Sequence, residues 1–435
     1  MKISGFENVI SIEQFEYCNK VDEHEMCRFI CYAREKDVDS LLKLCDSDCK
    51  IEDDLFAFEG HITDISLSKN ISGNRLEVSV IGKTYLFDEE VHSRIFQNPE
   101  KTLSDILSCI GSMSDIKHTG QQDKVIEGII IQDNISDWSF LKNLAHILGE
   151  RLFSADSVFI STNGTETIEL TEEECIDFRF SVGRKESHLS CRLNKSLSIG
   201  SVLNFNGKTF VIVCKKYLFD EGQYYFEYEL DEKKDTECNP IIINEGILEA
   251  IVKENNDPDK TGKIQVSFSS ETMEDCMEEN AAWIERECFY SSKSFGAVFI
   301  PAVDDKVLVR VINGKAYIIG SLRTEAFNEA YQSQDNKYII LDDKVFIEFK
   351  EGSISIINND NNISLSDKQI SINLGDKTQM LIESGKASIQ IDKTTIEITG
   401  DISGASGKIM IEAKNEASIS ATSVNIKGKS GVSIN

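Results

Sequence analysis

The sequence lacks the features that indicate export, membrane insertion or common catalytic machinery. No apolar run approaches the ~18 residues of a membrane helix, and residues 1–17 have no apolar signal-peptide core. We therefore expect assembly in the cytoplasm without a signal peptide. All six histidines precede residue 189, and there is no G-x-S-x-G, H-E-x-x-H or P-loop motif. We expect a protein that is not an enzyme and uses no cofactor.

Basic residues are also scarce relative to acidic ones. The net charge is −28, and almost all of it precedes residue 350, because residues 350–435 hold nine Lys against ten acidic residues. Nucleic-acid binding depends on clustered Lys and Arg, so we expect no nucleic-acid partner. The abundant carboxylates leave a glycosidase pair open as an alternative.

Cysteine is not scarce, since the chain has twelve. They are dispersed along a chain expected to stay in a reducing compartment, which favours free, buried thiols over disulfides. Cys27 and Cys31, with Cys45 and Cys49, form two C-x3-C pairs that fall within zinc-ligand spacing. Unligated thiols are the favoured interpretation, so no metal site is predicted, and a metal at these cysteines stays open.

The tail, residues 353–435, has no aromatic residue, proline, cysteine or histidine. It consists of short segments with alternating apolar and polar residues, which is the period of a strand with one buried face. The repetition resembles a β-solenoid, yet each strand supplies only two or three aliphatic side chains. Three copies wound around one axis would fill so narrow a core, so the tail predicts a homotrimer. The predicted spike core comprises Ile354, Ile356, Ile372, Ile391, Ile398, Ile411, Val424, Ile426 and Ile434.

The rest of the chain is predicted to be mainly β with a few helices. Amphipathic helices are expected at 100–112 and 137–152, capped by Thr102 and Asp137. The Lys-rich acidic stretch 231–240 is the clearest linker. We expect a hub over 1–240, a small barrel over 241–323, a connector over 324–352 and a spike over 353–435.

The central segment carries a specific family resemblance. Residues 246–268, 281–287 and 295–322 resemble the oligonucleotide/oligosaccharide-binding (OB) domain of the VgrG and phage tail-spike family. The match includes Asp257, Pro258, Gly262, Trp283, Pro301 and Gly320. Asp257-Pro258-Asp259 before Gly262 is turn chemistry between two strands. One departure is Asp304, which stands where the family usually has glycine.

The resemblance extends to the order of hub, small barrel and β-helical spike. Residues 93–98 and 129–152 resemble hub segments of the same family. The resemblance implies hub barrels with flanking helices, an OB-fold barrel and a triple-stranded intertwined β-helix in a trimer. It implies a spike and baseplate hub of a contractile injection system, of the type VI, tailocin or phage-tail kind.

That system implies partners and a place of action. We expect tail tube and baseplate proteins as partners, carriage of effectors, ejection from the cell, and transient contact with the target membrane. The sequence ends within a strand pattern at GVSIN (431–435), which would expose strand edges. We therefore expect a PAAR-like tip protein at the C-terminus. A β-helical polysaccharide-degrading enzyme and an adhesin are the alternatives.

Overall fold

The computed structural model describes most of the chain, in two compact units. It describes residues 1–110, 116–118, 123, 125–154, 158–161, 167–184, 187–220, 223–232, 246–270, 273–277, 281–292, 296–312, 314–323, 335–400 and 407–412. The units are Met1–Thr324 and Glu325–Asn435. The described part is mainly β, as predicted. Among the described residues, no helix is long and apolar enough to cross a membrane.

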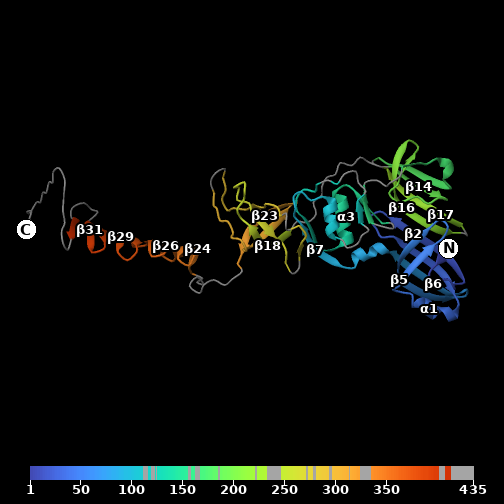
Figure 1. Cartoon of the computed structure of the whole chain (residues 1–435), viewed down its shortest axis with the longest axis horizontal. Coiled ribbons are helices and arrows are strands. Elements are labelled where there is room, and N and C mark those ends of the chain that lie inside the picture. The colour runs from blue at the N-terminus through green and yellow to red at the C-terminus, as the bar shows by residue number, and fades with distance from the viewer. Residues whose placement is uncertain are drawn as a thin grey trace, which may run out of the picture. The chain divides into compact units, whose positions relative to one another are not determined.

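A 12-stranded sheet forms the largest part of the first unit (Figure 1). Its spatial order is β1-β4-β5-β6-β3-β2-β16-β17-β14-β13, and β12 joins through β15 to β16. The strands of the first half are β1 (Lys2–Ile3), β2 (Ser11–Lys20), β3 (Met26–Ala33), β4 (Asp48–Glu52), β5 (Ala57–Asn70) and β6 (Gly73–Gly82). Those of the second are β12 (Thr167–Glu169), β13 (Asp177–Val182), β14 (Ser187–Leu193), β15 (Val202–Phe205), β16 (Lys208–Asp220) and β17 (Gln223–Glu232). Antiparallel pairing of β2 with β16 joins the two halves.

Alternating side chains of this sheet build one aromatic-rich core. Tyr217 lies 4.5 Å from Phe226 and 5.0 Å from Phe56, between ring centroids. Such ring pairs add to the stability gained by burying their area. The first half also contains η1 (Glu35–Asp37), α1 (Val38–Leu42) and η2 (Lys83–Asp88), and the second contains η3 (Glu172–Glu174).

Helices and short strands connect this sheet to the small barrel. They are β7 (Val91–Phe96), α2 (Leu103–Ile110), β8 (Ile116–His118), β9 (Ile130–Ser136), α3 (Asp137–Ile147), β10 (Arg151–Ser154) and β11 (Val158–Ser161). Thr102 caps α2 as predicted: Asp105 N donates to Thr102 Oγ1, and Thr102 N donates to Asp105 Oδ2. The prediction that Asp137 caps the next helix is wrong. Ser136 is the N-cap of α3, because its Oγ accepts from Ser139 N at 3.2 Å.

The barrel region contains a five-stranded sheet in the order β19-β18-β22-β23-β21. The strands are β18 (Gly246–Glu254), β19 (Gln265–Ser267), β21 (Glu285–Arg286), β22 (Lys306–Ile312) and β23 (Lys315–Leu322), with β20 (Glu274–Asp275) paired to β7 instead. The linker expected at 231–240 begins later than predicted, since β17 continues to Glu232. Residues 233–240 lie outside the described residues.

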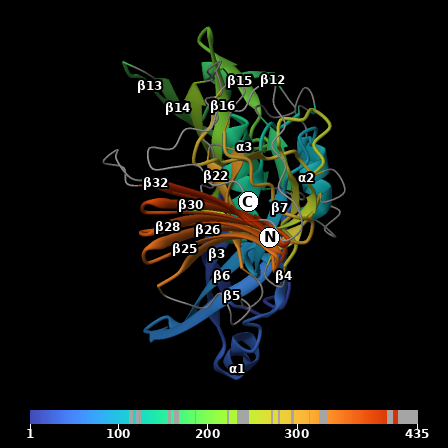
Figure 2. The ribbon, with the colours of Figure 1, turned by 90° about the vertical axis from the view of Figure 1, so that its left-hand side faces the viewer.

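The second unit is a nine-stranded antiparallel meander in which each strand pairs with the next along the chain (Figure 2). Its strands are β24 (Lys337–Asp342), β25 (Val345–Lys350), β26 (Ser353–Asn358), β27 (Asn361–Ser366), β28 (Gln369–Leu374), β29 (Thr378–Glu383), β30 (Lys386–Ile391), β31 (Thr394–Gly400) and β32 (Gly407–Glu412).

The structure differs from two of the predictions for this unit. The sheet begins at Lys337, so β24 and β25 occupy much of the expected connector 324–352. Over residues 337–400 and 407–412, each strand pairs antiparallel with the next, so this part of the chain forms hairpins and not the coils of a solenoid. Positive φ at Gly352, Asn359, Gly385 and Asp392 allows the tight turns. The intertwined triple helix remains a prediction.

Candidate functional site

The apolar face of the C-terminal sheet is the first candidate site. Directly paired residues share a face, so two aliphatic rows run across the sheet. The first row is Ile356, Ile363, Ile372, Met380, Ile389 and Ile396, and the second begins Ile354, Leu365, Ile370 and Ile382. Except for the half-buried Ile372, these side chains are 36–48% exposed in the single chain. A contiguous exposed apolar surface of this kind marks an interaction site.

The opposite face of the same sheet is mostly polar from β26 onward, although Ile357 and Leu381 lie on it and are half-buried. Ser355, Ser364 and Ser371 pair in a row, and Ser355 Oγ lies 3.4 Å from Ser364 Oγ. In the next row Asn373 Nδ2 donates to Asn362 Oδ1 at 2.7 Å. These two hydrogen bonds form within one chain, whereas most of the aliphatic side chains on the other face are exposed in it. Over β26 to β30 the sheet is therefore amphipathic, with its exposed aliphatic side chains on a single face.

The predicted spike-core residues are distributed accordingly. Ile354, Ile356, Ile372 and Ile391 lie on the apolar face of β26, β28 and β30. By backbone register, Ile398 pairs with Ala387 and Ile411 pairs with Ile396. Val424, Ile426 and Ile434 lie outside the described residues. Burial of this set in a common core stays a prediction.

Asp257 organises the turn at the start of the OB motif. Its carboxylate accepts hydrogen bonds from Thr261 Oγ1 (2.6 Å) and from the backbone N–H groups of Asp259 (3.0 Å), Thr261 (2.7 Å) and Lys263 (3.2 Å). The Thr261 hydroxyl above all, with the N–H donors, lowers the pKa of Asp257 to about 2. The adjacent Pro258 is exposed and fits an early turn position. Gly262 has φ +82°, which favours glycine.

The other OB-motif residues lie around the barrel wall. Trp283 is half-buried beside Ile284, which pairs with Ile264 in the core. Pro301 and Gly320 line the same hollow of about 180 Å³. Asn255 Nδ2 donates to the Pro301 carbonyl at 2.9 Å. These residues lie at turns and at the barrel wall, and their structural role stays a prediction.

Asp304 stands where the family usually has glycine, and its backbone has a conformation that favours glycine. Its φ is +72°, in the left-handed region, and its N–H donates to Val252 O at 2.9 Å. The turn therefore keeps the glycine-type conformation although the residue has a Cβ. Asp tolerates this conformation better than most residues.

The barrel core is completed by strands from the preceding segment, which the sequence did not reveal. Ile95 of β7, and Ile129 and Ile131 at β9, pack in one buried cluster with barrel residues such as Val252 and Val309. The main chain joins as well, because Ile129 N donates to Gly314 O at 2.7 Å. Nothing local marks these isoleucines as barrel residues, because their partners lie more than a hundred positions away.

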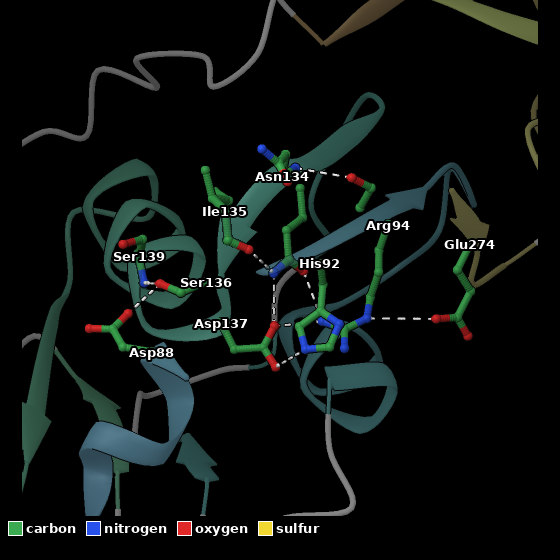
Figure 3. Close-up of polar contacts among 11 residues, drawn as sticks. Asp88, His92, Arg94, Asn134, Ile135, Ser136, Asp137, Ser139 and Glu274 are labelled. Atoms are coloured by element: carbon green, nitrogen blue, oxygen red, sulfur yellow. Dashed lines mark hydrogen bonds and ion pairs between the residues drawn. The ribbon is translucent and has the colours of Figure 1, made fainter. Parts of the chain in front are cut away.

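A buried polar cluster lies next to the contact of β7 and β9 with the barrel (Figure 3). Arg94 Nη1 donates to Asp137 Oδ1 at 2.6 Å and to Gln132 Oε1 at 3.0 Å, and Gln132 Nε2 donates to Asp137 Oδ1 at 2.8 Å. His92 Nε2 lies 3.7 Å from Asp137 Oδ2. Arg94 Nε lies 3.7 Å from Glu274 Oε2 of β20, so the cluster also reaches the barrel region. A buried pair of this kind is costly to break from one side.

Lys101 provides a second buried polar contact there. Its Nζ donates to the carbonyls of Asn98 (3.2 Å), Ile126 (3.0 Å) and Gly128. Burial lowers the pKa of Lys101 to about 8. The loop it holds approaches the barrel closely, because a Cβ on Gly128 would lie 2.6 Å from Gly314 O. Lys101 therefore fixes a loop and has no catalytic partner among the contacts described.

The cysteines considered as zinc ligands do not assemble into a site. Cys27, Cys31 and Cys49 are buried in the hydrophobic core, whereas Cys45 is exposed. Burial raises the pKa values of Cys31 and Cys49 to about 11, which disfavours the thiolate a metal needs. Across the described ranges, no group of three or more His, Cys, Asp or Glu side chains is placed to hold a metal ion.

Comparison with known proteins shows which family the chain resembles. Residues 248–322 match the model of the type VI secretion system/phage-baseplate injector OB domain. The resemblance to the VgrG and phage tail-spike family is confirmed. A search of curated protein sequences finds no significant match to this VgrG-like chain.

Comparison with solved structures extends the similarity to most of the VgrG-like chain. The Escherichia coli c3393 protein is described as a type VI secretion component structurally similar to the T4 tail proteins gp27 and gp5. It is 15% identical, with a TM-score of 0.53 over 74% of this chain and 99% of that one. This similarity shows a shared fold.

Two further solved structures are more distant. A Francisella PdpA–VgrG complex is 12% identical, with a TM-score of 0.45 over 92% of this chain and 83% of that chain. A tail protein of Neisseria meningitidis is 9% identical, with a TM-score of 0.40 over 51% and 92%.

Proposed function

We propose that three copies of this chain form the hub and spike of a contractile injection system. In this proposal the hub caps the tail tube within the baseplate, the OB barrels gather the chains, and the C-terminal segments form a rod that pierces the target envelope. The protein is structural and not enzymatic. It assembles in the cytoplasm and leaves the cell on contraction, carrying a PAAR-like tip protein or effectors.

The observation that carries the proposal is the exposed aliphatic face of the C-terminal sheet. Ile354, Ile356, Ile363 and Leu365 lie on one face of two paired strands, with serines on the other. A single-layer sheet with one exposed apolar face gains stability by burying that face against a partner. Identical copies supply an identical face, and three such sheets around an axis enclose a narrow core, which has no aromatic side chain from residue 353 onward.

The first test is the mass of the purified full-length chain. Sedimentation or light scattering should give the mass of three chains at micromolar concentration. A monomer that stays folded over residues 337–412 would refute the proposed spike. Proteolysis monitored by mass spectrometry tests this second point, since an uncovered sheet should be cleaved early.

The second test addresses function in the source cell. Deleting the gene should remove contraction-dependent delivery, and immunogold labelling should place the protein at the baseplate end of sheared particles. Delivery that persists without the protein would contradict the proposal. Release of soluble oligosaccharides from purified glycans would instead favour the polysaccharide-degrading alternative, and binding to cell surfaces without particles would favour an adhesin.

A further inference from the structure

A pair of cysteines faces each other where the two halves of the 12-stranded sheet meet. In the antiparallel pairing of β2 with β16, Cys18 lies opposite Lys216, and Cys214 lies opposite Lys20. Cys18 and Cys214 are therefore diagonal neighbours on one face of the sheet. Their Sγ atoms are 3.9 Å apart, although the residues are separated by 196 positions in the sequence.

An irregularity in the strand lies next to Cys214. The pairing of β16 with β17 shifts register between Ile212 and Cys214, as at a β-bulge. A bulge bends its strand and redirects the neighbouring side chain. Cys214 is buried, whereas Cys18 is only half-buried.

The two thiols differ in ionisation. The hydrogen bond with Cys214, and more weakly the charge of Lys216, lower the pKa of Cys18 despite its partial burial. The contact with Cys18 and burial raise the pKa of Cys214. Cys18 is also the less buried of the two, so it is the thiol suited to attack a disulfide, and Cys214 is placed to resolve the product.

We propose that Cys18 and Cys214 form a reversible redox site. A disulfide between them would link β2 to β16, the strands that join the two halves of the 12-stranded sheet. The oxidant is a small-molecule disulfide such as oxidised glutathione. The Cys18 thiolate attacks one of its sulfurs, forming a mixed disulfide and releasing one glutathione thiolate. Cys214 then loses its proton and attacks the Cys18 sulfur, which releases the second glutathione as a thiolate that takes up a proton. The small molecule is reduced by two electrons and the cysteine pair is oxidised by two.

Closure has a structural consequence that other thiol modifications lack. The bond would join strands from the two halves of the sheet and restrain a very long loop in the unfolded chain, which stabilises the folded state. The sulfurs must approach from 3.9 Å to about 2 Å, which needs a small movement of the strands. Both cysteines lie within the 12-stranded sheet of one chain, so the bond can form whatever the oligomeric state of the protein.

Peptide mapping of the full-length wild-type chain tests the proposal directly. The protein is equilibrated anaerobically in buffers of reduced and oxidised glutathione, alkylated, digested and analysed by mass spectrometry. We expect a peptide pair linked through Cys18 and Cys214 in most chains under oxidising buffer, and none after dithiothreitol. Cys45 serves as an internal control, since its Sγ contacts the Thr63 carbonyl and not a thiol. It should carry only the glutathione adduct.

Stability measurements with variants complete the test. Oxidation should raise the urea midpoint of the wild type and of Cys45→Ser, and should leave the midpoints of Cys18→Ser and Cys214→Ala unchanged. The proposal is overturned if both thiols remain alkylatable in oxidised glutathione, or if Cys18 stops at the mixed disulfide. The wild-type mapping decides this even where a variant folds poorly.

Discussion

Replacing Ile363 by Asp tests whether the aliphatic face of the C-terminal sheet is the trimer interface. Ile363 lies in the middle of β27, paired with Ile356 on one side and Ile372 on the other. Its neighbour Ser364 points to the opposite, polar face. Ser364→Asp is therefore a matched control, with the same new charge one residue away and no predicted contact with the core.

The expected effect follows from the exposed fraction of the side chain. Ile363 is 47% exposed in the single chain, so assembly buries about half a side chain, worth roughly 1 kcal/mol per chain. Three chains lose about 3 kcal/mol, which is roughly a 100-fold weaker association. Burying three carboxylates near one axis costs several kcal/mol more for each. The substituted chain should be largely monomeric at micromolar concentration.

Sedimentation velocity over a concentration series measures the effect, and thermal unfolding in the same buffer reports on the hub. The hub transition should stay unchanged in both variants, because the substitutions lie in the second unit. Ser364→Asp should remain trimeric. The reasoning is refuted if Ile363→Asp sediments as the wild type does, or if both substitutions dissociate the protein equally.

Three further predictions concern the first unit, each measured by urea unfolding. Asp257→Asn should destabilise the chain at pH 7. The difference in stability from the wild type should shrink as the pH falls from about 4 through about 2. The pKa of Asp257 is lowered in the folded state, so the stability that its carboxylate contributes is lost when the group is protonated. Asp259→Asn, at an exposed neighbour, should change the free energy of unfolding little. A destabilisation by Asp257→Asn that does not vary with pH would contradict the stabilising role of the ionised Asp257 carboxylate. Asp304→Gly should stabilise by about 0.5–1 kcal/mol and Asp304→Ala should destabilise by about 1 kcal/mol, given φ +72°; equal effects would argue against a strained turn. Arg94→Met should cost about 3–5 kcal/mol because it leaves Asp137 buried without its charge partner, and adding Asp137→Asn should recover part of that loss; simple additivity would show that the pair is not coupled.

The sequence predicted the parts of the fold that have local signals. Alternation in residues such as Ile354 and Ile356 is a property of neighbouring residues, so it predicts strands and their faces directly. The OB motif is likewise local, since Asp257 and Gly262 belong to one turn. The start of the tail sheet was missed because the YIILD run of β24 places Ile339 and Ile340 side by side and breaks the alternation.

The remaining features depend on residues far apart in the chain. Ser136 rather than Asp137 caps α3, because Arg94, from another strand, binds the Asp137 carboxylate. Sequence alone gives both residues good capping chemistry and does not distinguish them. Cys18 and Cys214 meet only because the two halves of the 12-stranded sheet pair through β2 and β16. No spacing rule connects them.

The contacts at the barrel define a mechanical unit that differs from the expected domain boundary near residue 241. Ile95, Ile129 and Ile131 precede that boundary, yet they lie in the barrel core. Gln97 Nε2 donates to Val266 O at 3.1 Å, which adds a buried hydrogen bond across the same boundary. Separating the segments would expose an apolar core and leave buried polar groups unpaired, both of which are costly. A force applied to the barrel therefore acts on β7 and β9 as well, and in the proposed spike the load would pass into the hub through packed side chains and not through a linker.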